Sequence, residues 1–158
     1  KNEKLPMRLT GIGISPKPHG LLDYAMKYYH RIKEFFGDEL KDLEMTEADF
    51  DVTSDYDHGA YNNPVKEVRE AMYYLGQKEA IIVDPCYTGK AFAGLLEMVK
   101  NGDIKQGEKV IFLHTGGSPG INTPHHRIEI EKEKESTGCA ACFEYQGYYG
   151  ATQDQGKS

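Results

Sequence analysis

The most informative stretch of this chain is a short apolar run with the loop that follows it, Ala80-Ile81-Ile82-Val83-Asp84-Pro85-Cys86-Tyr87-Thr88-Gly89-Lys90. Four consecutive apolar residues, 80–83, are typical of a strand that is covered on both faces in a parallel sheet. The turn formers Asp84 and Pro85 end the run at once. Because ligands bind beyond the carboxyl ends of the strands in open α/β sheets, the loop is a candidate binding site.

A second apolar run, residues 110–113, leads in the same way into His114-Thr115-Gly116-Gly117. Both loops place a threonine, Thr88 or Thr115, where its hydroxyl can face a cleft shared by the two strand ends. Taken alone, each loop is better explained by structure, with Thr88 as a helix N-cap and the glycine pair as a turn. The two loops together favour a common site.

Hydrophobic periodicity predicts strands and helices in alternation around these loops. Residues 7–15 alternate and then run apolar, which predicts a buried strand. Apolar residues spaced by three and four predict helices with apolar stripes over 21–36, 65–75 and 92–99. Residues 38–51 are acidic, with Phe50 and Val52 as the expected buried points beside them, and residues 54–64 are rich in turn formers, which predicts a loop there. This order predicts an α/β fold with three layers, in which helices cover both faces of a mainly parallel sheet.

Composition excludes several classes of protein. The chain has 158 residues and a net charge of −6, which suits one domain and gives no basic surface for nucleic acid. The longest apolar run, 80–83, is far shorter than the roughly 20 residues that span a bilayer. Three cysteines are too few for a disulfide framework and no signal segment is visible, so a cytoplasmic location is expected.

The two loops and their separation resemble the C-terminal portion of the D-cysteine desulfhydrase and 1-aminocyclopropane-1-carboxylate deaminase family. The resemblance is carried by residues 83–95 and 112–120, and the order of elements extends it to roughly residues 7–120. Members of that family are pyridoxal-phosphate enzymes with the tryptophan synthase β-subunit fold, also called fold type II. The resemblance implies that this chain is part of such an enzyme, with pyridoxal 5'-phosphate as its cofactor.

The resemblance also implies roles for individual residues. In the family, the tyrosine of the first motif lies against the cofactor and near the substrate, and the next residue faces the pyridine ring. A second tyrosine comes from a Gly-Tyr-Gly loop, which is matched here only by Ala60-Tyr61-Asn62. The implied catalytic residues are therefore Tyr87 and Tyr61, and the implied cofactor-binding residues are Thr88, Thr115, Gly116 and Gly117.

Thr88 indicates the type of reaction. The family has an acidic residue at this position in the deaminases and a threonine in the desulfhydrases. A neutral hydroxyl beside the pyridine nitrogen makes the cofactor a milder electron sink, which suits β-elimination with a leaving group. The resemblance therefore implies D-cysteine desulfhydrase-type elimination on a small amino acid, with release of ammonia. Ring-opening deamination is the nearer alternative, and a non-catalytic α/β binding or assembly subunit is the alternative from another class.

Two parts of the family's machinery have no match in this sequence. Family members carry the Schiff-base lysine and the phosphate-binding loop in an N-terminal half of comparable size. Lys90 belongs to the start of the motif's helix, where a structural or solvated role is expected. The chain thus resembles about half of an enzyme, and this half is expected to be inactive alone. We expect it to associate with a second copy or with a complementary N-terminal half.

The last part of the chain differs from the family. Residues 1–124 are expected to form the C-terminal portion of the catalytic domain, and residues 125–158 an irregular tail of unknown role. Cys139 and Cys142 have the spacing of a redox pair or of half a zinc site. A complete zinc site needs four ligands, and only His125 and His126 lie nearby, so no metal is expected.

Overall fold

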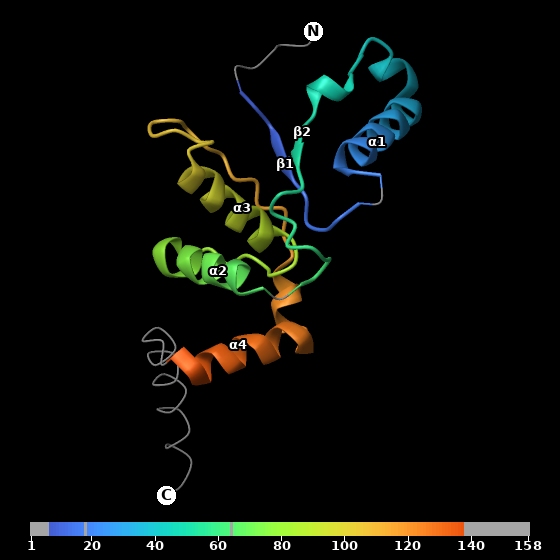
Figure 1. Ribbon diagram of the computed structural model, residues 1–158. Helices are drawn as coiled ribbons and strands as arrows, with labels where there is room; N and C mark the ends of the chain where they lie inside the picture. The colour runs from blue at the N-terminus through green and yellow to red at the C-terminus, as the bar shows by residue number, and fades with distance from the viewer. Residues whose placement is uncertain (1–6, 18, 64, 138–158) are drawn as a thin grey trace, which may run out of the picture.

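The computed structural model describes residues 7–17, 19–63 and 65–137, and Figure 1 shows the arrangement of their elements. None of the helices in these ranges is long and apolar enough to cross a membrane. The strands and helices are β1 (Thr10–Ile12), α1 (Leu21–Phe36), β2 (Asp51–Thr53), α2 (Lys66–Glu79), α3 (Thr88–Asn101) and α4 (Pro124–Thr137), with short 3-10 turns at Gly37–Leu40, Glu47–Asp49 and Ser118–Asn122.

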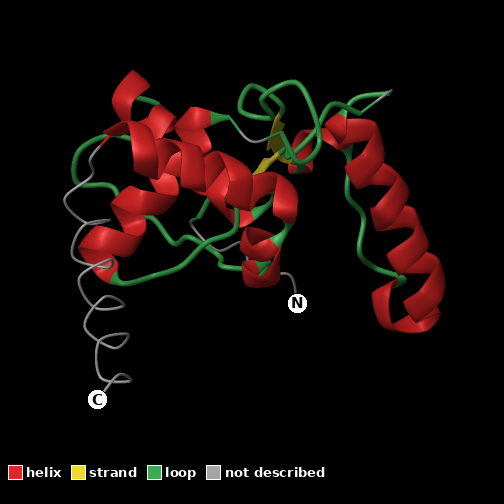
Figure 2. Ribbon diagram, turned by 90° about the horizontal axis from the view of Figure 1, so that it is seen from below, coloured by secondary structure: helices red, strands yellow, loops and turns green. Residues whose placement is uncertain are grey.

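β1 and β2 form a parallel pair in which Gly11 lies opposite Val52. α1 makes the connection between them, as expected for parallel strands. Figures 1 and 2 show α1 on one side of the pair and α2 and α3 on the other. α3 comes close to β1 because Gly94 has no side chain. A Cβ atom there would lie 3.1 Å from the Ile12 side chain and 3.0 Å from Tyr56.

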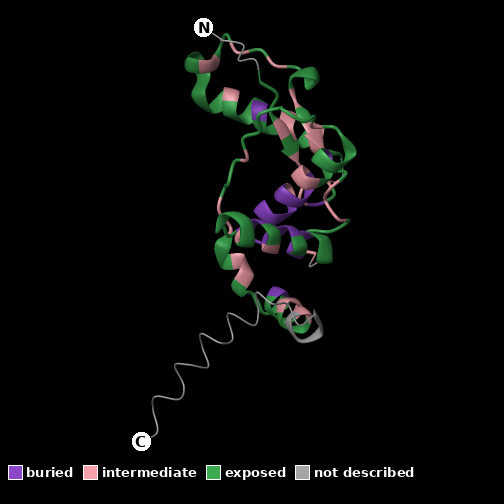
Figure 3. Cartoon of the chain, turned by 90° about the vertical axis from the view of Figure 1, so that its left-hand side faces the viewer, coloured by how far each residue is buried: buried purple, intermediate pink, exposed green. Residues whose placement is uncertain are grey.

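The buried residues gather where α2 and α3 pack together, as the purple segments of Figure 3 show. The apolar stripes that predicted these helices face each other. The core consists of Val68, Ala71, Met72, Leu75, Val83, Phe92 and Ala93, with Phe112 and Ile121 packed against it. The three helices predicted from periodicity are therefore confirmed, and so is an α/β fold with parallel strands.

The two apolar runs that were predicted to be central strands do not form strands. Residues 80–83 and 110–113 have no ladder partner within the described ranges. Val83 and Phe112 face the core, but the side chains of Ile82 and Ile111 are 64% and 84% exposed. The physical reason is that a strand exists only when a neighbour accepts its hydrogen bonds. The parallel sheet is confirmed for β1 and β2 alone, and β2 contains Val52, for which no strand was predicted.

The start of the expected irregular tail is helical. Residues Pro124–Thr137 form α4, which packs against α2 through an ion pair of 2.5 Å between Arg69 and Glu133. The Tyr73 hydroxyl also donates to Glu133, at 3.1 Å. Residues 138–158, including Cys139 and Cys142, lie outside the described residues. The domain boundary at residue 124 stays a prediction.

Candidate active site

The loop between residue 83 and α3 is organised by the carboxylate of Asp84, which is fully buried. It accepts hydrogen bonds from the backbone N–H groups of Cys86, Tyr87 and Thr88 at 2.7–2.8 Å. These groups belong to the first turn of α3 or precede it directly, where a helix offers no internal acceptors. Asp84 thus caps α3. Sequence analysis treated Asp84 only as a turn former, although an aspartate just before a helix is also a common capping signal.

Asp84 also joins the two loops that sequence analysis placed in one site. The Thr88 hydroxyl lies 2.7 Å from Oδ1 of Asp84 and 3.2 Å from the carbonyl oxygen of Gly116. Gly117, at φ +98°, lies against the Asp84 carboxylate, and a Cβ atom there would overlap it. The His114 ring contacts the carbonyl of Ile82 at 2.9 Å. The two loops therefore meet, as the sequence predicted.

Tyr61 and Tyr87 lie face to edge beside these loops. Their hydroxyl groups are hydrogen-bonded, and their rings are 5.8 Å apart at an angle of 69°. Both side chains are about half exposed. The hydrogen bond with Tyr87 is the main cause that holds the pKa of Tyr61 well above its ordinary value, and one with Cys86 is the next. An ionised phenol could no longer donate these hydrogen bonds. The two tyrosines implied by the family resemblance are thus in contact.

Thr88 and Thr115 have different surroundings. Thr88 is only 2% exposed, and its hydroxyl is bonded to Asp84 and close to Gly116. Thr115 is exposed. Gly116 has φ +100°, and no atom lies within 4 Å of the place where its Cβ would be. The structure therefore buries Thr88 beside Asp84, places the half-buried Gly117 against the same carboxylate, and leaves open space at Gly116.

Lys90 has the structural role expected for it. Its side chain is fully buried, and its ammonium group donates to the carbonyl oxygens of Ile14, Asp57 and Ala60 at 2.6–2.8 Å. Burial lowers its pKa, and the nearby Cys86 and Asp57 partly oppose that effect. An ammonium group has three donors, so all of them are used.

His126 is a residue of this region that sequence analysis considered only as a metal ligand. It is fully buried on α4, and its Nε2 lies 2.6 Å from the Oδ1 of Asn62, next to Tyr61. No local pattern marks this contact, since the two residues are far apart in the chain. Within the part of the chain that the structure describes, no three His, Cys, Asp or Glu side chains are grouped to hold a metal.

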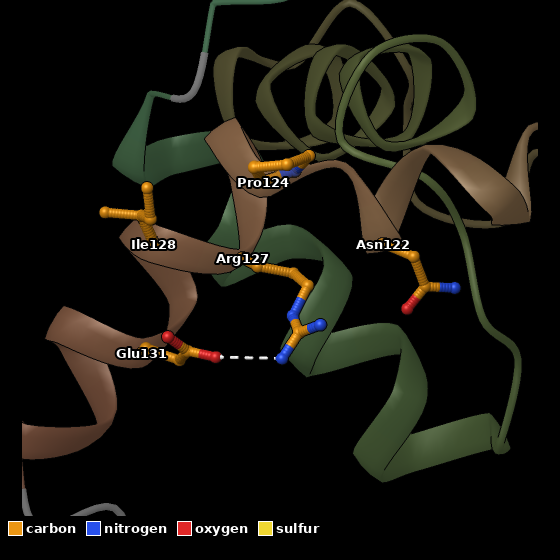
Figure 4. A pocket seen from close by; sticks show the side chains of 5 residues that line it. All are labelled: Asn122, Pro124, Arg127, Ile128 and Glu131. Carbon is orange, nitrogen blue, oxygen red and sulfur yellow. Dashed lines mark hydrogen bonds and ion pairs between the residues drawn. The ribbon is translucent and has the colours of Figure 1, made fainter.

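Two surface hollows lie away from these residues. The first, of about 220 Å³, is at the start of α4, where Arg127 and Glu131 form an ion pair (Figure 4). The second, of about 740 Å³, lies between α2 and α3 and is lined by Asp55, Tyr56, His58, Glu67, Glu70, Ala71, Tyr74, Ala93, Leu96 and Glu97. Neither is lined by the site residues that the resemblance implies, which are Tyr61, Tyr87, Thr88, Thr115, Gly116 and Gly117.

Comparison with known proteins agrees with this geometry. A Bradyrhizobium protein named 1-aminocyclopropane-1-carboxylate deaminase is 41% identical over 117 residues, which are 73% of this chain and 33% of that protein. A protein of the same name from Allorhizobium ampelinum is 37% identical over 79 residues, 50% of this chain and 23% of that protein. The chain spans about a third of the length of the curated relatives that it matches, which is less than the half expected from the sequence.

A solved structure described as an ACC deaminase homologue superposes with a TM-score of 0.59 at 31% identity. The match covers 78% of this chain and 34% of that one. Residues 12–116, from β1 to the second loop, match the protein family described as pyridoxal-phosphate dependent enzyme. This range includes the Asp84 loop, Lys90 and both tyrosines. The chain therefore belongs to the family of pyridoxal-phosphate dependent enzymes.

Proposed function

We propose that this chain is the C-terminal portion of a lyase that acts on a small amino acid and releases ammonia. The observation that carries the proposal is the contact between the hydroxyl groups of Tyr61 and Tyr87. Positioned tyrosines are able to give and take protons at a substrate. The pair lies beside the two loops that carry the family motifs.

The residues present fit the ring end of pyridoxal phosphate. Gly116 leaves open space in front of its backbone, Thr115 exposes a hydroxyl, and Tyr87 offers an aromatic face. Thr115, Gly116 and Gly117 would line the pyridine side, with Thr88 beneath them. When bound, the cofactor supplies an electron sink for bond breaking at the amino acid's α-carbon. This chain would supply the shape around the ring and the proton-bearing groups.

Thr88 supports β-elimination of the D-cysteine desulfhydrase type. Its proton is directed at the Asp84 carboxylate and its oxygen accepts the backbone N–H of Asp84, so Thr88 presents no charged partner to the ring nitrogen. A neutral partner stabilises a protonated ring less than a carboxylate does. Thr115 is then the hydroxyl that is free to approach the nitrogen. Neutral residues of this kind around the ring would favour loss of a β-substituent from the substrate.

Ring-opening deamination is the second candidate, and the names of the relatives favour it. The proteins from Bradyrhizobium and Allorhizobium are named 1-aminocyclopropane-1-carboxylate deaminases. Both reactions release ammonia and both need a proton to be moved at the substrate. They differ in the substrate, and a purely non-catalytic binding or assembly subunit would perform neither.

A chimera tests the proposal. Residues 12–116 replace the matching segment of the Bradyrhizobium relative, and the purified chimera is assayed with D-cysteine for sulfide and with the cyclopropane amino acid for ammonia. We expect sulfide release, which a matched Tyr87→Phe chimera loses. Ammonia from the cyclopropane substrate alone would favour the second candidate. A folded chimera that binds the cofactor and turns over neither substrate would overturn the proposal.

A further inference from the structure

Lys90 lies at a junction of three segments that are distant in sequence. Its ammonium group reaches the carbonyl of Ile14, just beyond β1, and the carbonyls of Asp57 and Ala60, in the loop between β2 and α2. The lysine itself lies in the first turn of α3, three residues after Tyr87. One side chain therefore connects α3 to the loop that carries Tyr61.

The geometry fixes Tyr61 in particular. The carbonyl of Ala60 belongs to the peptide bond that leads directly into Tyr61, and this bond is planar. The hydrogen bond of 2.6 Å from Lys90 to that oxygen therefore restricts the position of the backbone nitrogen of Tyr61. Tyr87 is placed by the other end of the same connection, since it directly precedes α3.

The loop has a conformation that requires such support. His58 and Asn62 both have positive φ angles, 57° and 56°, which are uncommon for residues other than glycine. Two of the three carbonyls that Lys90 binds, those of Asp57 and Ala60, lie on either side of His58 and Gly59. A neutral side chain could not supply three donors to carbonyls from three directions.

We propose that Lys90 is a positioning residue, whose ammonium group holds the 57–61 loop so that the hydroxyl of Tyr61 meets that of Tyr87. The contact between the hydroxyl groups does not depend on the activity proposed above. Only its use in proton transfer rests on that proposed function. The inference is therefore testable in this chain without cofactor or substrate.

The test measures the phenol pKa of Tyr61 by NMR in the full chain labelled with ¹³Cζ-tyrosine, with Tyr61→Phe and Tyr87→Phe used for assignment. In Lys90→Met, we expect this pKa to fall back toward the ordinary tyrosine value of about 10. Loss of a positive charge alone would raise a tyrosine pKa, so a fall reports separation of the two hydroxyl groups. Lys100→Met is the matched control, because Lys100 is exposed on the same helix. It should leave the pKa of Tyr61 unchanged.

Lys90→Ala with added propylammonium provides a second measurement. The added amine should restore both the helical circular dichroism and the raised pKa of Tyr61, and propanol should not. A Lys90→Met chain that keeps its helices and the high pKa of Tyr61 would overturn the inference. Two results with Lys90→Ala would also overturn it: the amine restores the helices but not the raised pKa of Tyr61, or the amine restores neither. In both cases Lys90 would serve general stability.

Discussion

The buried carboxylate of Asp84 lies so close to Gly117 that a Cβ atom at Gly117 would overlap Oδ1 of Asp84. The same carboxylate caps α3 through three backbone N–H groups and binds the Thr88 hydroxyl. The position of the second loop relative to α3 is therefore set by one buried acid. Any change at Gly117 has to displace that acid or the loop.

Gly117→Ala should destabilise the chain more than the positive φ angle alone requires. Gly107→Ala is the control, since Gly107 also has a positive φ, 93°, but no atom lies within 4 Å of its Cβ position. We expect the free energy of unfolding to fall further in Gly117→Ala by about 1–3 kcal/mol, the usual cost of overpacking a buried site. Urea unfolding of the two variants measures the difference. Equal losses would show that Asp84 moves aside freely.

Tyr61→Phe and Tyr87→Phe should each reduce turnover in the chimera, because each removes one hydroxyl of the pair. A general acid–base group typically accounts for a factor of about 10²–10⁴ in rate. The double variant should lose little more than either single variant, since residues that act as a unit are not additive. Steady-state rates at full cofactor occupancy test this. Losses that multiply in the double variant would mean that the hydroxyl groups act independently.

The contact between His126 and the Tyr61 loop should weaken as the pH falls. Burial is the main cause that lowers the pKa of His126, and the charge of His125 is the next. Arg69 and Lys90 lower this pKa further, whereas Asp84 raises it. The Nδ1 of His126 has no hydrogen-bond partner among the described residues, so a proton there would not be satisfied. The pKa of His126 is lower in the folded chain than in the unfolded chain, where it is about 6.5. The neutral side chain therefore stabilises the fold above pH 6.5, and this stabilisation is lost as the pH falls through the lower pKa of the folded chain.

Amide hydrogen exchange in α4 at pH 7.5 and pH 5.5 measures this effect. We expect exchange, corrected for its intrinsic pH dependence, to show weaker protection at the lower pH. His126→Gln should remove the difference, and the neighbouring exposed His125→Gln should not. A pH effect that persists in His126→Gln would assign it to another group.

Glu133 should show the corresponding effect at more acidic pH. The hydrogen bond from Arg69, with a further one from Tyr73, lowers the pKa of the Glu133 carboxyl. The ionised Glu133 therefore stabilises the fold above about pH 4.3, the pKa of a glutamate in an unfolded chain. This stabilisation is lost as the pH falls through the lower pKa of the folded chain. Glu133→Gln should cost about 1–2 kcal/mol of unfolding free energy at pH 7. Glu131→Gln, in an exposed pair with Arg127, should cost much less.

The apolar runs without strand partners should make the chain associate, with itself or with a complementary half. Ile82, Ile111 and Leu113 are 64–84% exposed, and exposed apolar segments of this kind pair with other chains. Sedimentation over a concentration series should show a mass above that of one chain. Ile111→Lys should shift the distribution toward the monomer. A monomer at every concentration, with no binding of an apolar dye, would contradict the expectation.

The sequence by itself determined α1, α2 and α3 and the meeting of the two motif loops, whereas α4 lies in a segment for which an irregular tail was expected. α1 was predicted from Leu21 to Phe36 and is found there, because a helix satisfies its backbone within a few residues and buries one regular face. The same holds for the stripes of α2 and α3. The two motif loops also carried enough information to predict that they meet.

Only the tertiary structure decided which segments pair and which groups meet. Residues 80–83 and 110–113 have the composition of strands, but a ladder depends on a neighbour that local sequence does not supply. The three residues of β2, Asp51 to Thr53, gave no strand signal, yet β2 pairs with β1 because α1 returns the chain alongside it. The buried contacts of Asp84 with Gly117, of Lys90 with three carbonyls and of His126 with Asn62 join residues far apart in the chain. These contacts form because the folded backbone brings distant segments together, and local periodicity does not predict which segments meet.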